Sequence, residues 1–300
     1  MADETETHLS RPLLRLEEAY ANFRPTPHLS ERTLTYGGDE HQHLLVFGPS
    51  ANNDRHRLIF YVHGGGWRGG HTRRARFIGK FLAEEGYTVA LCGFRAAPQA
   101  IFPAQLEDVF SGIAEVLDHR SEFHFTDGII LAGFGSGAHL ASLVAFDQEQ
   151  QTRHCLPRES FAGLLCFSGM LDFSVCRDEA ACRDIRALMG GRRGWDAADP
   201  MRHVAGDEDL PVLVVHGADD HVIPPDAARA FVVAVNAGRE DGPAHLLVMP
   251  GAKHDDVLRL FIERRPETEA VVEWLAQRTA EGEGAEEQPQ LCIVGETEKA

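Results

Sequence analysis

Apolar segments of strand length alternate with amphipathic segments of helix length over most of the chain. RLIFYVHG (57–64) is a continuous apolar run, which is typical of a strand buried on both faces of a sheet. PAQLEDVFSGIAEVLDHR (103–120) carries its apolar residues at helical spacing. Further strands are predicted at 43–49, 87–94, 128–134, 161–169, 211–217 and 244–251, and further helices at 73–86, 137–146, 224–238 and 267–278.

This alternation predicts an α/β fold. Strands joined by helices imply βαβ crossovers, and therefore a mostly parallel sheet with helices on both faces. We expect one domain at 36–278, after a polar lead-in at 1–35 with one short helix at 15–23. The polar, Arg- and Gly-rich stretch 172–210 interrupts the rhythm and is expected to form a small cap-like insertion over the site. The acidic tail at 279–300 has little to pack, so we expect it to be disordered.

Charge and cysteine content narrow the class of protein. The 300 residues include 46 acidic and 29 basic ones, and the net charge of −17 argues against nucleic acid or an anionic membrane as the main partner. No apolar run is long enough to span a membrane and no signal peptide is visible, so we expect a soluble cytoplasmic protein. The six cysteines show no metal-ligand spacing and are expected to be free thiols.

The stretch LAGFGSGAHL (131–140) has the outline of a nucleophile elbow, the strand-to-helix turn G-x-S-x-G. The frame that fits runs from Gly133 to Gly137 and places Gly135 where the serine should be, with Ser136 one residue late. A glycine keeps the turn and relieves about 1–3 kcal/mol of backbone strain, but it supplies no attacking oxygen.

Ser136 has two alternative roles. It is either a displaced nucleophile or a small residue that gives its backbone N–H to an oxyanion hole. A shift of one residue turns a helical side chain by about 100°, so the second role is favoured.

The stretch HGGGW, His63–Trp67, follows the apolar run at 57–62 and is the candidate oxyanion loop. Consecutive glycines at a strand end let backbone N–H groups approach a ligand closely, although a flexible turn is the alternative. We expect the donors to be Gly65 and Gly66, together with Ser136. His63 and Trp67 are candidate substrate-binding residues. Trp67 would stack an aromatic substrate, and packing of the loop is an equal alternative for it.

Two later loops supply an acid and a base. HGADDHVIP (216–224) places the candidate acid at Asp220, with Asp219 as the adjacent rival. MPGAKHDD (249–256) places the candidate general base at His254. Elbow, acid and base thus follow one another along the chain in the order used by hydrolases with a nucleophile elbow.

Several stretches together resemble a known family, namely HGGGW, FRAAPQAIFPAQLEDV, GFGSGAHLA, CFSGMLDF, HGADDHVIP and GAKHDDVL. They are similar to the kynurenine formamidase (arylformamidase) and carboxylesterase-like branch of the α/β-hydrolase superfamily, over roughly residues 40–275. The resemblance implies an α/β-hydrolase fold and cleavage of a small ester or formamide, with no metal or cofactor. The family's elbow G-x-S-A-G-A-H-L matches Gly133 and Gly137–Leu140, which puts Gly135 in the serine position.

Three functional hypotheses remain open at this point. In the first, hydrolysis persists, either through Ser136 or through water activated by His254 and Asp220. In the second, the pocket serves ligand binding or a lyase or cyclase reaction. In the third, the chain is an inactivated hydrolase. The expected partner is a small molecule, with an aromatic one as an option, and a homo-oligomer is compatible with the sequence. The cap arginines Arg183, Arg186, Arg192 and Arg193 meet a substrate carboxylate or are simply solvated, and His139 and His216 are expected to be structural.

Overall fold

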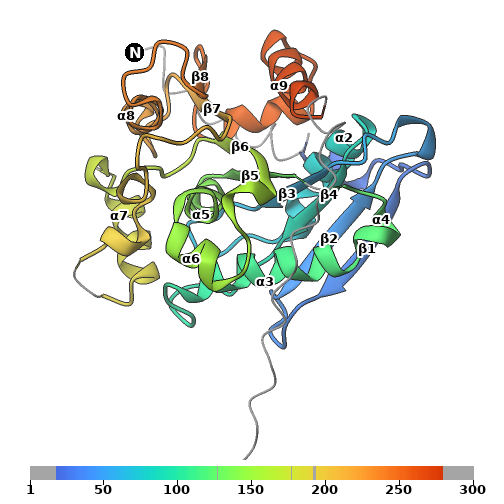
Figure 1. Ribbon diagram of the computed structural model, residues 1–300, viewed down its shortest axis with the longest axis horizontal. Helices are drawn as coiled ribbons and strands as arrows, with labels where there is room; N and C mark the ends of the chain where they lie inside the picture. The colour runs from blue at the N-terminus through green and yellow to red at the C-terminus, as the bar shows by residue number, and fades with distance from the viewer. Residues whose placement is uncertain (1–17, 127, 177, 192–193, 280–300) are drawn as a thin grey trace, which may run out of the picture.

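An eight-stranded sheet forms the centre of the computed structural model, which describes residues 18–126, 128–176, 178–191 and 194–279 (Figure 1). Its strand order is β1-β2-β4-β3-β5-β6-β7-β8. The strands are β1 Ser30–Thr35, β2 His43–Gly48, β3 Leu58–Val62, β4 Thr88–Cys92, β5 Ile129–Phe134, β6 Phe161–Phe167, β7 Val212–Gly217 and β8 Ala244–Met249. All pairs from β4 to β8 are parallel, whereas β2 is antiparallel to both β1 and β4. The predicted mostly parallel sheet is therefore confirmed.

Helices cover both faces of this sheet, as Figure 1 shows. One face carries α3 (Ala104–Asp118), α5 (Ser136–Phe146) and α8 (Pro225–Asn236), and the other carries α2 (Arg76–Glu84) and α9 (Pro266–Gln277). Shorter helices are α4 (Arg120–Phe123), α6 (Gln148–Arg153) and α7 (Glu179–Leu188). Along β3, Phe60 packs into the first core and Tyr61 into the second. Side chains of a strand alternate between faces, so the continuous apolar run feeds both cores.

The first strand lies outside the domain boundary expected from the sequence. Strand β1 pairs with β2 along its whole length, so the expected start of the domain at residue 36 falls one strand too late. The cause is the edge position of β1: in SERTLT only Leu34 is buried, and an exposed edge strand needs no apolar pattern. Of the short helix expected at 15–23, residues 18–23 are helical and 15–17 lie outside the described residues.

The segment 172–210, expected as a cap, contains α7 and short 3₁₀ turns. Ile185 and Leu188 of α7 are fully buried in the same core as α3 and α5. Leu188 also accepts a 2.8 Å hydrogen bond from the Phe102 N–H. Helix α7 is thus packed onto the body of the domain. Arg192, Arg193 and the expected disordered tail from residue 280 onward lie outside the described residues.

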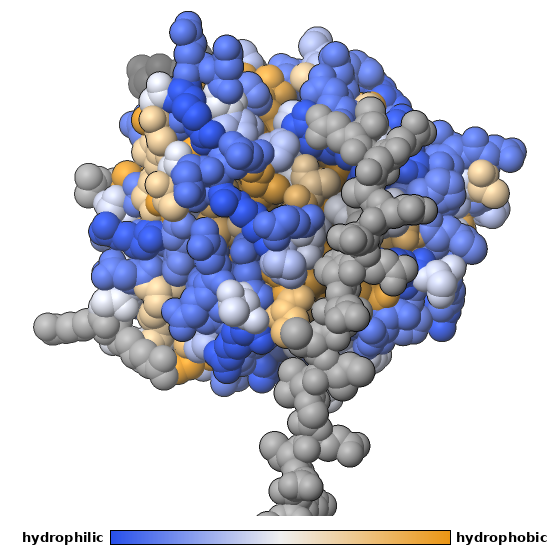
Figure 2. Space-filling view, in the orientation of Figure 1, coloured by the Kyte–Doolittle hydropathy of each residue, from blue (hydrophilic) through white to orange (hydrophobic). Residues whose placement is uncertain are grey.

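The face seen in Figure 2 is mainly hydrophilic, with small apolar patches between the polar side chains. No helix in the described ranges is long and apolar enough to cross a membrane.

Candidate active site

The predicted elbow has the strand–turn–helix geometry, with Gly135 between β5 and α5. Its backbone has φ 54° and ψ −113°, a conformation that L side chains rarely adopt. The turn is fixed by a 2.9 Å hydrogen bond from the Gly135 N–H to the Phe167 carbonyl. The helix start lies very close to β3, because a Cβ on Gly137 would stand 2.0 Å from the Val62 oxygen. Glycine at 137 therefore lets α5 begin directly against the sheet.

The predicted base and acid lie in contact beside this turn. His254 follows β8, and its Nδ1 lies 2.8 Å from Oδ2 of Asp220, in the loop after β7. The other carboxylate oxygen of Asp220 accepts hydrogen bonds of 2.9 Å from the N–H groups of both Val222 and Ile223. Oδ2 also lies 3.2 Å from Nε2 of the buried His216. The rival Asp219 is exposed, so the geometry favours Asp220 as the acid.

Asp220 is held as a carboxylate. Burial alone would raise its pKa, but hydrogen bonds from His216, His254 and the Ile223 N–H outweigh burial and keep the pKa of Asp220 well below its ordinary value. The charged Asp220 accepts a hydrogen bond from the Nδ1–H of His254. The other ring nitrogen, Nε2, then carries no hydrogen and can accept one. His254 is therefore arranged to take a proton at Nε2.

Nε2 of His254 faces the position of the absent side chain. An ideal Cβ on Gly135 would lie 3.6 Å from His254 Nε2 and 3.9 Å from Cε1, both ordinary contact distances. A hydroxyl on that Cβ would come within hydrogen-bond reach of the base.

Ser136 is placed differently. Its side chain is 4% exposed, and its Oγ makes no hydrogen bond to His254 or to any other described residue. The geometry supports the frame in which Gly135 occupies the nucleophile position. The role of Ser136 stays a prediction.

The HGGGW stretch forms a tight loop after β3, beside the elbow. Gly65 and Gly66 have φ values of +134° and +64°, and the Gly65 carbonyl accepts the N–H of Gly69 at 3.2 Å. The loop touches the end of β5, because a Cβ on Gly64 would lie 2.5 Å from the Phe134 ring. Within the described chain, no hydrogen bond occupies the N–H of Gly65, Gly66 or Ser136. These groups are available to an oxyanion, and their assignment as donors stays a prediction.

Trp67 is buried rather than open to a ligand. It is 2% exposed, and its Nε1–H donates to Nδ1 of His139 at 3.1 Å. His139 in turn donates from Nε2 to the Ala198 carbonyl at 2.6 Å and stacks on Phe173. Its burial lowers the pKa of His139 to about 3. The ring of Trp67 is already packed against other side chains, so its expected stacking on an aromatic substrate is not supported. The contacts of His139 agree with the structural role expected for it.

His63 is also mostly buried, but it borders a cavity. Its ring stacks on Phe94 with centroids 4.6 Å apart, and burial lowers the pKa of His63 to about 4. The cavity beside it has a volume of about 370 Å³. Its lining mixes apolar and polar groups: Glu18, Tyr61, His63, Gly64, Gly65, Gly70, His71, Arg74, Ala75, Phe77, Ile78, Phe134, Asp255 and Leu258. Sequence reasoning did not find Asp255 or Leu258, whose only signal is their place just after His254.

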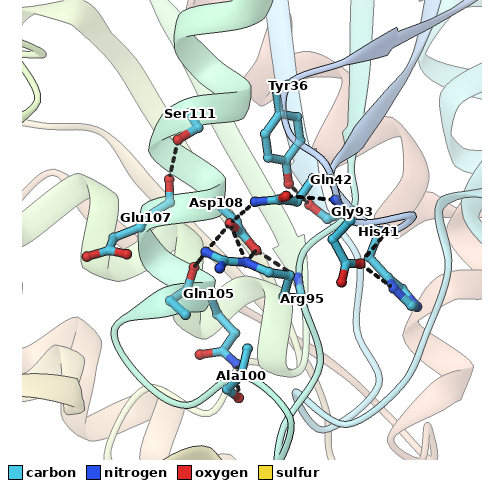
Figure 3. A network of polar contacts seen from close by, with 12 residues as sticks. Tyr36, His41, Gln42, Gly93, Arg95, Ala100, Gln105, Glu107, Asp108 and Ser111 are labelled. Atoms are coloured by element: carbon cyan, nitrogen blue, oxygen red, sulfur yellow. Dashed lines mark hydrogen bonds and ion pairs between the residues drawn. The ribbon is translucent and has the colours of Figure 1, made fainter.

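An ion pair supports the segment that packs on the HGGGW loop (Figure 3). Asp108 of α3 is 1% exposed and lies 2.7 Å from Nη2 of Arg95. It also accepts the Arg95 backbone N–H and the Gln42 side-chain amide, each at 2.8 Å. Arg95 lies between Phe94, which stacks on His63, and Ala97, whose N–H donates to the Trp67 carbonyl at 2.8 Å. Asp108 therefore positions the loop indirectly.

Helix α7 lies against the same loop. A Cβ on Gly66 would stand 2.5 Å from Oδ2 of Asp184, and the other Asp184 oxygen pairs with Arg68 at 3.1 Å. The expected cap arginines Arg183 and Arg186 are exposed. Asp184 is thus the charged residue through which α7 meets the loop.

The BD-FAE family model matches residues 44–234 of the chain. The chain belongs to the BD-FAE family. This BD-FAE member is 26% identical over 245 residues to the probable isoprenylcysteine alpha-carbonyl methylesterase ICMEL2 of Arabidopsis thaliana, covering 75% of this chain and 57% of that protein. It is 29% identical over 109 residues to the kynurenine formamidase of Danio rerio, covering 36% of each chain. It thus spans less than two thirds of the length of these relatives.

Solved structures show the same fold for this BD-FAE member. A truncated carbohydrate esterase from gut microbiota superposes with a TM-score of 0.73 at 18% identity, covering 85% of this chain and 99% of that one. Esterase B from Lactobacillus rhamnosis gives 0.73 at 22% identity, covering 93% and 96%. The predicted α/β-hydrolase fold and superfamily are confirmed.

Proposed function

We propose that this protein hydrolyses small carboxylic esters or formamides by direct attack of water, more slowly than a hydrolase with an elbow serine. One observation carries the proposal: His254 Nε2 faces the position of the absent Gly135 side chain, 3.6 Å from the ideal Cβ. The 2.8 Å contact with Asp220 orients His254 for this task.

The reaction needs one displacement and no acyl-enzyme. Water in the space beside Gly135 gives a proton to His254 Nε2, and its oxygen attacks the substrate carbonyl carbon. The N–H groups of Gly65, Gly66 and Ser136 hold the oxyanion. The intermediate collapses, the C–O or C–N bond breaks, and His254 returns the proton to the leaving group. Asp220 stabilises the imidazolium formed in between.

The relatives support this reaction class. ICMEL2 is named as a probable methylesterase and the Danio rerio protein as a kynurenine formamidase, so the two names cover an ester and a formamide. A hydrolase that has lost its nucleophile keeps about 10³–10⁴-fold catalysis over water through its oxyanion hole and substrate binding. We therefore expect a rate enhancement over water of at least that order, to which general-base catalysis by His254 adds. The cavity of about 370 Å³ beside the loop is large enough for a small molecule; Gly64, Gly65 and Phe134 line it, whereas Gly135 and His254 do not.

The proposal is tested by hydrolysis of p-nitrophenyl acetate and N-formylkynurenine. We expect the wild type to turn over slowly without a burst of p-nitrophenol, His254→Ala to lose this rate, and Ser136→Ala to retain it. A Ser136→Ala variant without activity would instead make Ser136 the nucleophile. If neither substrate is hydrolysed but an aromatic acid raises the Tm, the site binds a ligand and the proposal fails.

A further inference from the structure

Two thiols meet at the start of α7. The Sγ atoms of Cys176 and Cys182 lie 3.0 Å apart, and both side chains are partly exposed. Cys176 comes just before the helix, and Cys182 is its fourth residue. Cys92 and Cys166 are fully buried in the cores, by contrast. The described chain thus holds two thiols that are both close together and open to a small reagent.

We propose that Cys176 and Cys182 form a redox-active dithiol, which low-molecular-weight disulfides such as oxidised glutathione convert into an intramolecular disulfide. A disulfide has an S–S length of about 2.05 Å, so the two sulfurs must approach by only about 1 Å. Asp178 holds Cys182 in the first turn of α7, because it accepts the Ala181 N–H through Oδ1 at 2.8 Å and the Cys182 N–H through its carbonyl at 2.9 Å.

The order of the two exchange steps follows from the surroundings of each thiol. Burial and the neighbouring Cys182 raise the pKa of Cys176 to about 12, so Cys176 is a poor attacking group in the first step. Attack by Cys182, the fourth residue of α7, therefore comes first. Cys182 thiolate attacks the reagent disulfide, forms a mixed disulfide and expels one thiolate. Cys176 then loses its proton to solvent, attacks the Cys182 sulfur and expels the second thiolate, so that one reagent disulfide becomes two thiols.

The pair of Cys176 and Cys182 lies close to the predicted oxyanion loop, His63–Trp67. Asp184, two residues after Cys182, contacts Gly66 and pairs with Arg68. A disulfide closing residues 176–182 would tie the first turn of α7 to the chain that enters it. Such a link restricts the unfolded chain and the fraying of this helix end, so oxidation should stabilise the contact of α7 with the loop.

Trypsin offers a direct test because Arg177 separates the two cysteines. The full-length protein is incubated with oxidised glutathione, alkylated and digested, which places Cys176 in peptide 159–177 and Cys182 in peptide 178–183. We expect these peptides joined, lighter by two hydrogens than their sum, with fragmentation assigning the bond to Cys176 rather than to Cys166. The Tm of the oxidised protein should rise by a few degrees.

Three controls make the outcome decisive. Cys182→Ser should abolish the linked peptide and the Tm shift, whereas Cys155→Ser should leave both unchanged. Protein unfolded in urea should form the 176–182 link in a smaller fraction of chains, among other pairings. The proposal is overturned if folded wild type gives only glutathione adducts or alkylated thiols at these positions, or no more of the link than the unfolded chain. The readout is a mass, so it does not depend on the proposed hydrolysis.

Discussion

His254 Nε2 lies 3.6 Å from the point where Gly135 would carry a Cβ atom. The histidine follows β8 and the glycine follows β5, more than a hundred residues apart in the chain, and the sheet brings them together. Apart from the adjacent residues in the chain, only Nε2 and Cε1 of His254 lie within 4 Å of that point in the described structure, both at ordinary contact distances.

Gly135→Ser should restore a nucleophile. We expect kcat/KM on p-nitrophenyl acetate to rise at least about 10²-fold, because the new Oγ falls within reach of His254. The same change should lower the free energy of unfolding by about 1–3 kcal/mol, because φ is +54° at this position. Gly135→Ala is the matched control: it adds the same strain and no oxygen. An equal gain in Gly135→Ala, or no gain in Gly135→Ser, would contradict the assignment of the elbow.

Asp220→Asn should impair hydrolysis without removing the base. An asparagine cannot stabilise the imidazolium of His254, and we expect kcat to fall toward the value of the His254→Ala variant. Unfolding free energy should also change with pH. The pKa of Asp220 is lower in the folded than in the unfolded chain, so its contribution is present above about pH 4 and is lost as the pH falls further. Urea unfolding at several pH values measures the free energy of unfolding of both proteins. The difference in this free energy between wild type and variant should shrink in acid, and a difference that does not change with pH would contradict a stabilised carboxylate.

The buried histidines should make the protein sensitive to acid well above pH 4. His139 has a folded pKa of about 3, below the unfolded value near 6.5, so the unfolded chain binds the extra proton as the pH falls. The stability that its neutral form provides is complete above about pH 6.5, and we expect a loss of about 2 kcal/mol between pH 6.5 and 5. His139→Gln should flatten this slope by about one proton, measured by urea unfolding. The exposed His245 is the control, and an equal flattening in His245→Gln would refute the argument.

Asp108→Ala should weaken both the fold and the HGGGW loop. The substitution leaves the Arg95 N–H and guanidinium without their carboxylate, and we expect a loss of about 2–3 kcal/mol because Arg95 remains partly hydrated. Activity should fall as well, since the segment from Phe94 to Ala97 supports His63 and Trp67. Glu107→Ala removes the same charge one residue earlier and should change little. Similar effects in both variants would point to net charge rather than positioning.

The sequence predicted those parts of the fold in which burial leaves a pattern. The apolar run of β3 predicts a sheet covered on both faces, and the glycines of the elbow predict a tight turn. Both are present. Strand β1 was missed because its exposed edge permits polar residues. The frame of the elbow could be aligned from the sequence, but the approach of His254 to Gly135 depends on the paired order of β5 to β8.

Contacts between segments that are distant in the chain cannot be predicted from the sequence for the same reason. Trp67 looked like an aromatic platform in a glycine-rich loop, and only the packing of His139 and Phe173 around it shows that the ring is already used. The meeting of Asp184 with Gly66 joins α7 to a loop far away in the chain. No periodicity in the sequence encodes that contact.

The glycine at the elbow also determines which reagents can mark the protein. Fluorophosphonates and related organophosphorus compounds label serine hydrolases by forming an ester with the elbow hydroxyl. Gly135 has no oxygen to phosphorylate, and Ser136 Oγ has no hydrogen bond to the His254 that would activate it. A survey that finds hydrolases by such labels would pass over this protein, however much of their architecture it shares.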